Sequence, residues 1–134
     1  MKKFFIFVTG RDNAEIVDKK GIYGVSDRHK KAINKVNVGD SVLLYITGES
    51  VFYGVYEIKS ELYKDNKRVF KSSIRIIFPF RVKLKRIMKF TNSIQIKPLV
   101  NKLNFIKNKE KWYSNFFGQA VIEISRSDFE IIHP

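Results

Sequence analysis

The chain has 134 residues, with 26 Lys and Arg against 13 Asp and Glu and a formal net charge of +13. This length predicts a single domain over residues 1–134, and the hydrophobic content of 44% excludes an intrinsically disordered chain in spite of the charge. The 12 Phe and 6 Tyr residues, with abundant Ile and Val, favour strands and disfavour a helical bundle.

The first half of the chain predicts short strands and two helices. Asp12 is placed to cap a helix over residues 13–20, and Gly21 is placed to end it. Asp27 is placed to cap a second helix, in which Ala32, Ile33 and Val36 form the inward stripe. The predicted strands of this half cover residues 3–9, 22–25, 41–47 and 51–60.

The second half predicts further strands around residues 69–77, 80–90 and 119–124. Pro79 argues against a central strand at that point, because proline cannot donate to the ladder. Pro98 fits the first turn of a helix, and Ser127 fits the cap of a last turn that ends near Ile132. Mostly short strands with interspersed helices predict an α+β fold, a compact barrel or curled mixed sheet.

The excess positive charge is concentrated in one segment. Between Lys64 and Lys111 there are 15 Lys and Arg and only two acidic residues, whereas basic and acidic residues balance in the two flanks. Such asymmetry is typical of a surface that binds a polyanion. The other interpretation is a Lys-rich composition that clusters on a solvated face.

Within this segment, residues 81–85 alternate between basic and apolar side chains. In a strand, this pattern places Arg81, Lys83 and Lys85 on one face. Such a row can follow a phosphate backbone without reading its sequence. An ordinary half-buried strand with a hydrated basic face explains the pattern equally well.

Catalytic motifs are absent from the sequence, which has no phosphate-binding loop, dinucleotide fingerprint, nucleophile elbow or HExxH pair. With two histidines, His29 and His133, and no cysteine, neither a metal site nor a catalytic triad is supported. His29 lies between Arg28 and Lys30, which favours an exposed or phosphate-facing histidine over a catalytic base. We therefore expect a protein that is not an enzyme and holds no cofactor and no metal.

No apolar run approaches the roughly 18 residues that suggest a membrane helix. The apolar run at residues 4–8 is shorter than the roughly 7–15 residues of a secretory signal. We expect a cytoplasmic protein that does not contact a membrane.

Short motifs follow one another along the chain in a characteristic order. The N-terminal ones are Thr9-Gly10-Arg11-Asp12-Asn13, Gly21-Ile22-Tyr23-Gly24-Val25, Asp27-Arg28-His29-Lys30 and Val38-Gly39-Asp40. The C-terminal ones are Pro98-Leu99, Phe105-Ile106-Lys107-Asn108-Lys109, Trp112 and Phe116-Phe117-Gly118. Together they resemble the EVE domain, a member of the PUA-like superfamily and a relative of the YTH domain.

The resemblance implies a PUA-like β-barrel of mixed, curled sheet, flanked by short helices, with a pocket for a modified base. YTH relatives hold methylated adenine in an aromatic cage, and EVE domains read modified cytosine or adenine in DNA. By position, Tyr23 matches the first cage wall, Gly24 meets the base through its main chain, and Asn13 reads the base edge. Thr9 and Val25 flank these positions. The second YTH wall falls near Leu84, so Phe78, Phe80 or Phe116 would have to replace it.

The leading hypothesis is a nucleic-acid-binding module that takes a modified base of DNA or RNA into an aromatic-lined pocket. The residues expected to bind phosphates are Arg28, Lys30, Arg81, Lys83 and Lys85. A nuclease or base-modifying enzyme with unrecognised carboxylates is the first alternative. A pocket for a small nucleotide-like ligand is the second.

Overall fold

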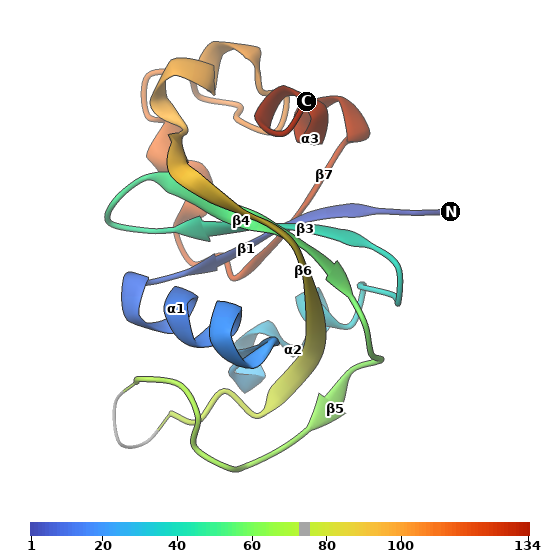
Figure 1. Ribbon diagram of the computed structural model, residues 1–134. Helices are drawn as coiled ribbons and strands as arrows, with labels where there is room; N and C mark the ends of the chain where they lie inside the picture. Colours follow the sequence, from blue (N-terminus) through green and yellow to red (C-terminus); the bar gives the residue numbers. More distant parts are fainter. Residues whose placement is uncertain (73–75) are drawn as a thin grey trace.

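A computed structural model describes residues 1–72 and 76–134 and shows a curled, mixed sheet with short helices around it (Figure 1). Seven strands belong to the sheet within these residues, in the order β2-β6-β4-β3-β1-β7, with β5 paired to β6. The strands are β1 (Phe4–Thr9), β2 (Ile22–Val25), β3 (Ser41–Ile46), β4 (Val51–Ile58), β5 (Tyr63–Lys64), β6 (Phe80–Gln95) and β7 (Val121–Ile124). The predicted α+β class with a curled sheet is confirmed.

Six short helical segments connect or cover the strands. They are α1 (Arg11–Lys20), η1 (Asp27–His29), α2 (Lys30–Ile33), η2 (Lys97–Lys102), η3 (Trp112–Phe116) and α3 (Arg126–Ile132) within the described residues. Gly21 ends α1 as predicted, with φ at +67° and its N–H donating to the carbonyl of Val17. The last helix is capped by Ser125 instead of Ser127, because the Ser125 side chain accepts from the N–H of Asp128.

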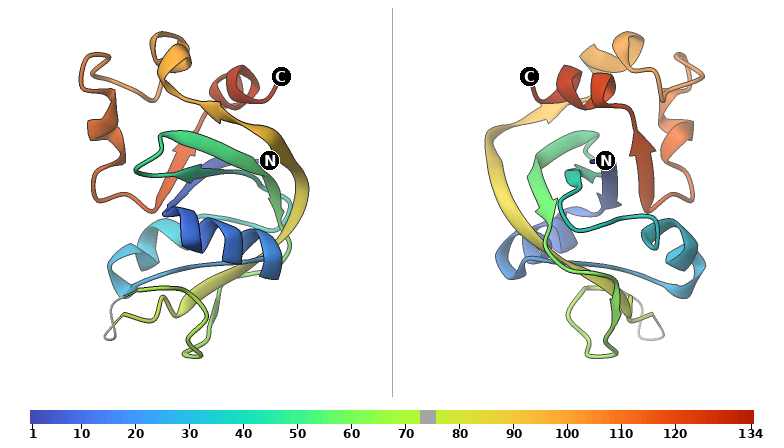
Figure 2. Two further views of the ribbon diagram at one scale, coloured as in Figure 1. Left: turned by 60° about the vertical axis from the view of Figure 1, so that its left-hand side comes forward. Right: turned by 90° about the vertical axis from the view of Figure 1, so that its right-hand side faces the viewer.

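The central strands are apolar on both faces, as their continuous hydrophobic runs require. β1 pairs in parallel with β3, and its alternate residues enter two different core clusters. Phe5 and Phe7 pack on the side that carries α1, whereas Phe4 and Ile6 pack on the side of η2 and α3. Figure 2 shows the sheet curling with the helical segments distributed on both sides of it.

The sheet forms a half-barrel, and β2 and β7 stand at the two ends of its strand order. β6 is long enough to pair with β2 through its first residues and with β4 along the rest of its length. This arrangement brings β2 opposite the end of β1. The cleft between these elements positions the candidate site.

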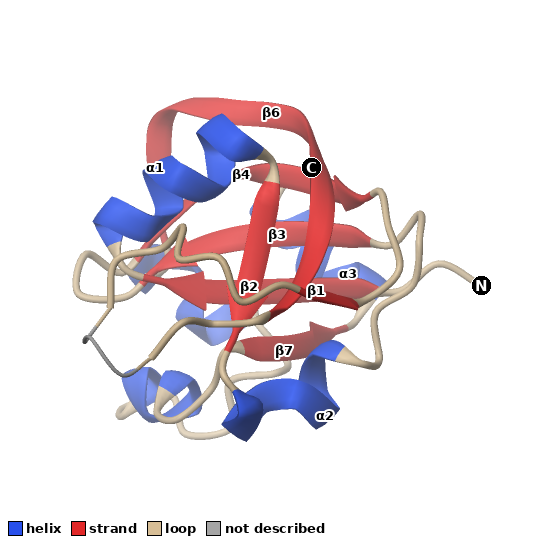
Figure 3. Ribbon diagram, turned by 90° about the horizontal axis from the view of Figure 1, so that it is seen from below, coloured by secondary structure: helices blue, strands red, loops and turns tan. Residues whose placement is uncertain are grey.

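The strand predicted over residues 69–77 is wrong for the part that is described, and residues 73–75 of that prediction lie outside the described residues. The described residues 65–72 and 76–79, which we call the strap, are irregular and lie on the side of the sheet that carries α1 (Figure 3). The backbone of Lys71 forms its hydrogen bonds with the side chain of Asn13, at 2.8 and 2.7 Å, and not with a neighbouring strand.

Candidate functional site

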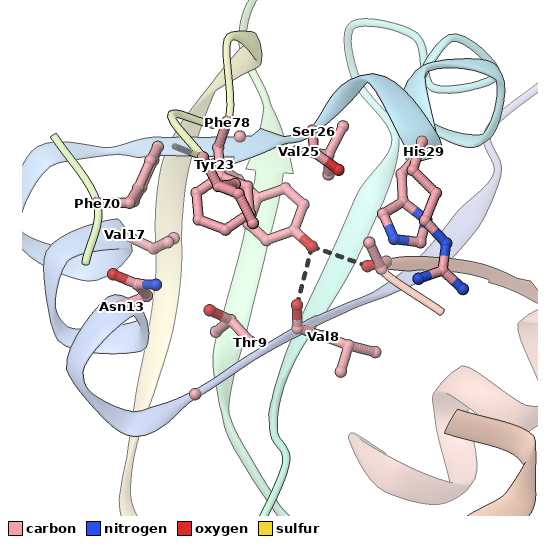
Figure 4. A pocket seen from close by; sticks show the side chains of 15 residues that line it. Val8, Thr9, Asn13, Val17, Tyr23, Val25, Ser26, His29, Phe70 and Phe78 are labelled. Atoms are coloured by element: carbon pink, nitrogen blue, oxygen red, sulfur yellow. Dashed lines mark hydrogen bonds between the residues drawn. The ribbon is translucent and has the colours of Figure 1, made fainter. Parts of the chain in front are cut away.

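A cavity of about 350 Å³ lies between the end of β1, the first turns of α1, β2, η1 and the strap (Figure 4). Its volume is within the range of small-molecule sites in proteins. The structure brings together at this cavity all five residues that the sequence assigns to a base pocket. They are Thr9, Asn13, Tyr23, Gly24 and Val25.

Tyr23 joins the two ends of the half-barrel. Its ring stacks on Phe7 with centroids 4.3 Å apart, and its hydroxyl lies 2.9 Å from the carbonyl oxygen of Val8 and 2.8 Å from that of Ala120. Burial raises the pKa of Tyr23 far above its ordinary value, so the hydroxyl keeps its proton and donates it to one of these carbonyls. Tyr23 is therefore both a core aromatic and a fixed wall of the cavity (Figure 4).

Asn13 lines the cavity from the first turn of α1, but its amide is already engaged. It donates to the carbonyl of Lys71 and accepts from the N–H of Lys71. A primary amide has two N–H donors and two acceptor lone pairs, so one donor and one acceptor position remain for a ligand. Asn13 thus holds the strap and keeps half of its hydrogen-bonding capacity.

The second aromatic wall comes from the strap. Phe70 and Phe78 line the cavity and meet edge to face, with centroids 6.2 Å apart. Phe78 has a φ of +58°, a conformation that bulky residues rarely adopt and that is often found at functional sites. Sequence periodicity does not find Phe70, because the strap follows neither the helical nor the strand repeat.

Of the three rings that the sequence offers for this wall, Phe78 lines the cavity, whereas Phe80 and Phe116 do not. Phe80 starts β6 and lies under the ammonium groups of Lys30 and Lys64, at 5.0 and 5.9 Å from its ring centre. Phe116 stacks on Tyr45 at 4.1 Å in the core cluster on the opposite face of the sheet. Neither residue is among those that line the cavity.

Arg81 is fully buried, so its assignment to an exposed phosphate-binding row is wrong. The strap covers this part of the strand face: Nε of Arg81 donates to the carbonyl of Phe78 at 3.0 Å, and Nη2 donates to the carbonyl of Lys67. Nη1 lies 3.6 Å from a carboxylate oxygen of Asp65, and the guanidinium lies 5.4 Å from the ring centre of Phe70. Arg81 therefore holds both ends of the strap.

The other predicted phosphate-binding residues are exposed. Lys83 and Lys85 project from β6 on the face that the alternation predicts, while Val82 and Leu84 are buried. At the mouth of the cavity, burial and the charge of Arg28 lower the pKa of His29. The lowered pKa favours the neutral form of the His29 imidazole, and Arg28 supplies the permanent positive charge in the cavity lining.

The strap approaches β2 so closely at Gly24 that a larger residue does not fit there. A Cβ at this position would lie 2.8 Å from the carbonyl oxygen of Phe78 and 2.9 Å from Cε2 of Phe70. Real Cβ atoms do not approach other atoms this closely, so only glycine allows the strap to pack on β2.

We expect Gly24→Ala to push the strap away from β2 and to widen the cavity. Overpacking of this kind costs about 1–3 kcal/mol, which thermal unfolding measures directly. If the variant had the melting temperature and the ligand affinity of the parent, this close packing would be contradicted.

Among residues 1–72 and 76–134, the structure contains no group of three or more His, Cys, Asp or Glu side chains arranged for a metal ion. Within the same residues, no helix has the length and apolar composition needed to span a bilayer.

Known proteins resemble this chain in both sequence and fold. The EVE domain family matches residues 3–134. A UPF0310 protein from Pyrococcus horikoshii is 35% identical over 140 residues, which cover 96% of this chain and 95% of that protein. A UPF0310 protein from Pyrococcus abyssi is 35% identical over 138 residues, with 96% of each chain covered.

Solved structures share the fold at low sequence identity. A hypothetical protein from Leishmania major superimposes with a TM-score of 0.71 at 16% identity, covering 98% of this chain and 92% of that one. The Pho92 YTH domain, solved in complex with m6A, superimposes with a TM-score of 0.69 at 19% identity, covering 98% of this chain and 84% of that one. These similarities extend over nearly the whole chain.

Proposed function

The chain belongs to the EVE domain family, as the sequence motifs imply, and on this basis we propose that it is a nucleic-acid-binding module that takes a modified base into the cavity beside Tyr23. The observation that carries the proposal is the cavity itself, a pocket with fixed aromatic walls in a fold that is similar to a YTH domain solved with m6A. The base enters the cavity after it has been flipped out of the base stack.

The lining of the cavity supports this proposal chemically. An extruded base offers two flat faces and a polar edge. Tyr23, Phe70 and Phe78 supply rings, and Asn13 supplies the remaining amide donor and acceptor. Because hydrogen bonds hold both Tyr23 and Asn13 in place, little side-chain entropy is lost when a ligand binds.

Exposed lysines supply the attraction for the phosphate backbone in this proposal. Lys30, Lys83 and Lys85 are exposed and Arg28 stands at the cavity mouth, in a chain of net charge +13. Contacts of this kind add affinity for any polyanion and weaken steeply with salt. The cavity adds the discrimination between bases.

We expect the double charge reversal Lys83→Glu with Lys85→Glu to weaken binding to modified and unmodified strands by the same factor. Phosphate contacts carry no base information, so the preference for the modified strand stays as in the parent. Titrations at several salt concentrations measure both quantities, and the salt dependence becomes shallower in the variant. An unchanged affinity at low salt would show that these lysines do not face the backbone.

The direct test of the proposal is a binding screen with matched pairs of strands. Each pair differs only in one modification of cytosine or adenine, and the pairs are made as single-stranded and double-stranded DNA and RNA. At least one pair is expected to show a preference for the modified strand that persists at high salt. Equal, salt-sensitive binding of every pair would refute the base pocket and leave only a polyanion-binding surface.

A further inference from the structure

Three aromatic side chains stand together on η3 and the residue after it. Phe117 is 69% exposed and Tyr113 is 46% exposed, and their ring centres lie 5.8 Å apart. Trp112 meets Tyr113 edge to face at 5.8 Å and supports it from the core side. Large aromatic side chains exposed side by side mark an interaction surface more often than isolated exposed residues do.

This aromatic surface is next to the cavity. Phe117 precedes Gly118, where a Cβ would lie 3.0 Å from Nη2 of Arg28, a residue that lines the cavity. Ala120, three residues after Phe117, also lines the cavity and accepts from Tyr23. Three peptide units span at most about 11 Å, so the aromatic surface and the cavity are within reach of neighbouring nucleotides of one strand.

The charges around this surface favour a nucleic acid as its occupant. Lys107 and Lys111 are exposed on the segment that leads into η3, whereas the ammonium of Lys109 donates to the carbonyl of Leu103. Arg28 lines the cavity, and its guanidinium lies beside Gly118, the residue after Phe117. Glu110 is the one acidic residue between Lys107 and Phe117. Aromatic faces flanked by cations are the arrangement on which unpaired bases stack while their phosphates are held.

We infer that Tyr113 and Phe117 form a stacking platform for an unpaired base that neighbours the base held in the cavity. The inference rests on the proposed function for the position of the nucleic-acid strand. The stacking itself does not depend on that function. Stacking needs only a π-face, so the platform accepts any base and lengthens the site without adding sequence specificity. The ligand is thus a single strand of two or more nucleotides, and not an isolated base.

The test compares Phe117→Ala with the parent protein on short single strands. For each ligand, a matched strand carries an abasic site next to the central base, on one side or the other. We expect Phe117→Ala to weaken binding of the intact strand on the order of tenfold, as the loss of one stacked base does. One of the two abasic strands lacks the base that would stack on the platform. The variant and the parent are expected to bind that strand equally tightly, because no base is then left to stack on Phe117.

Two further variants separate stacking from folding and from general surface effects. Phe117→Trp keeps an aromatic face and is expected to restore the parent affinity. Ile87→Ser removes a side chain of comparable exposure, 51%, from β6, which lies on the opposite flank of the molecule from η3 (Figure 2). It is expected to leave the affinity unchanged. If the Phe117→Ala variant bound intact strands as tightly as the parent does, the inference would be overturned.

The platform and the base pocket can fail separately in this experiment. Unmodified single strands test the platform, because stacking does not require the modification. If the parent shows no preference for any modified strand while Phe117→Ala still binds intact strands more weakly, the platform stands and the base pocket does not. If the modified strand is preferred equally by parent and variant, and the overall affinities are the same, the base pocket stands and the platform does not.

Discussion

Replacing Arg81 with Met is expected to lower the free energy of unfolding by about 3 kcal/mol and to remove the preference for a modified base at the same time. Arg81 is 0% exposed, and its guanidinium donates to the carbonyls of Phe78 and Lys67. Methionine fills much of the same volume, but it takes the guanidinium donor away from both carbonyls. Each hydrogen bond to a charged group contributes about 1.5–3 kcal/mol, which gives the expected loss.

The preference for the modified base is lost because Arg81 joins the two parts of the strap that carry the aromatic wall. Without these bonds, Phe70 and Phe78 lose the support that keeps them on the cavity. A decrease in melting temperature on the order of 10 °C is expected for a domain of this size. Binding is then compared well below that temperature, with matched modified and unmodified strands.

Lys85→Met on the same strand is the control for Arg81→Met. It removes the same charge from an exposed position and is expected to change the melting temperature very little. A folded Arg81→Met variant with the stability and the base preference of the parent would show that Arg81 does not hold the strap against the cavity.

Replacing Tyr23 with Ala is expected to cost about 3–5 kcal/mol of stability and to remove the preference for the modified base. The ring that is lost stacks on Phe7, and the hydroxyl that is lost reaches the carbonyls of Val8 and Ala120 across the open side of the half-barrel. Weak, salt-sensitive binding is expected to remain, because the exposed lysines are untouched.

Tyr23→Phe separates the ring from the hydroxyl. It keeps the stack on Phe7 and loses only the hydrogen bond, so it is expected to cost about 1 kcal/mol and to retain the preference. Both variants are measured by thermal unfolding and then by titration of the folded protein. If the folded Ala variant preferred the modified strand by the same factor as the parent, Tyr23 would not be a wall of the base pocket.

The parts of the fold that the sequence predicts are those fixed by local patterns. The apolar runs of β1 and β3 are short and continuous, a pattern typical of strands that are buried on both faces. Both strands lie where these runs predict them. Gly21 ends α1 because a left-handed residue is required there. These features depend on neighbours in the chain, which a sequence displays directly.

Local patterns do not predict the strap, because long-range contacts determine it. Residues 69–72 have the composition of a strand, yet the backbone of Lys71 pairs with the side chain of Asn13, which is 58 residues away. Other residues of the strap bury Arg81, whereas Lys83 and Lys85, two and four residues later, stay exposed as the alternation predicts. Period-two patterns predict which side chains share a face, but not what covers that face.

The candidate site divides in the same way. Thr9, Asn13 and Tyr23 follow from the resemblance to a known family, and they meet at one cavity. The resemblance offers Phe78 as one of three candidates for the second wall, but it does not point to Phe70, which lies in an irregular segment. The sequence signal for Phe70 is limited to an aromatic residue that lies between the basic residues Arg68 and Lys71.

The measurement that tests the central claim most directly is an NMR titration of the labelled protein with a modified strand and its unmodified counterpart. The backbone N–H groups of Gly10 and Gly24 and the side-chain amide of Asn13 report on the cavity, and the N–H groups of Lys83 and Lys85 report on the basic surface. We predict that both strands shift the signals of the basic surface, whereas only the modified strand shifts those of the cavity. Identical shifts with both strands, or shifts on the basic surface alone, would contradict a pocket that recognises a modified base.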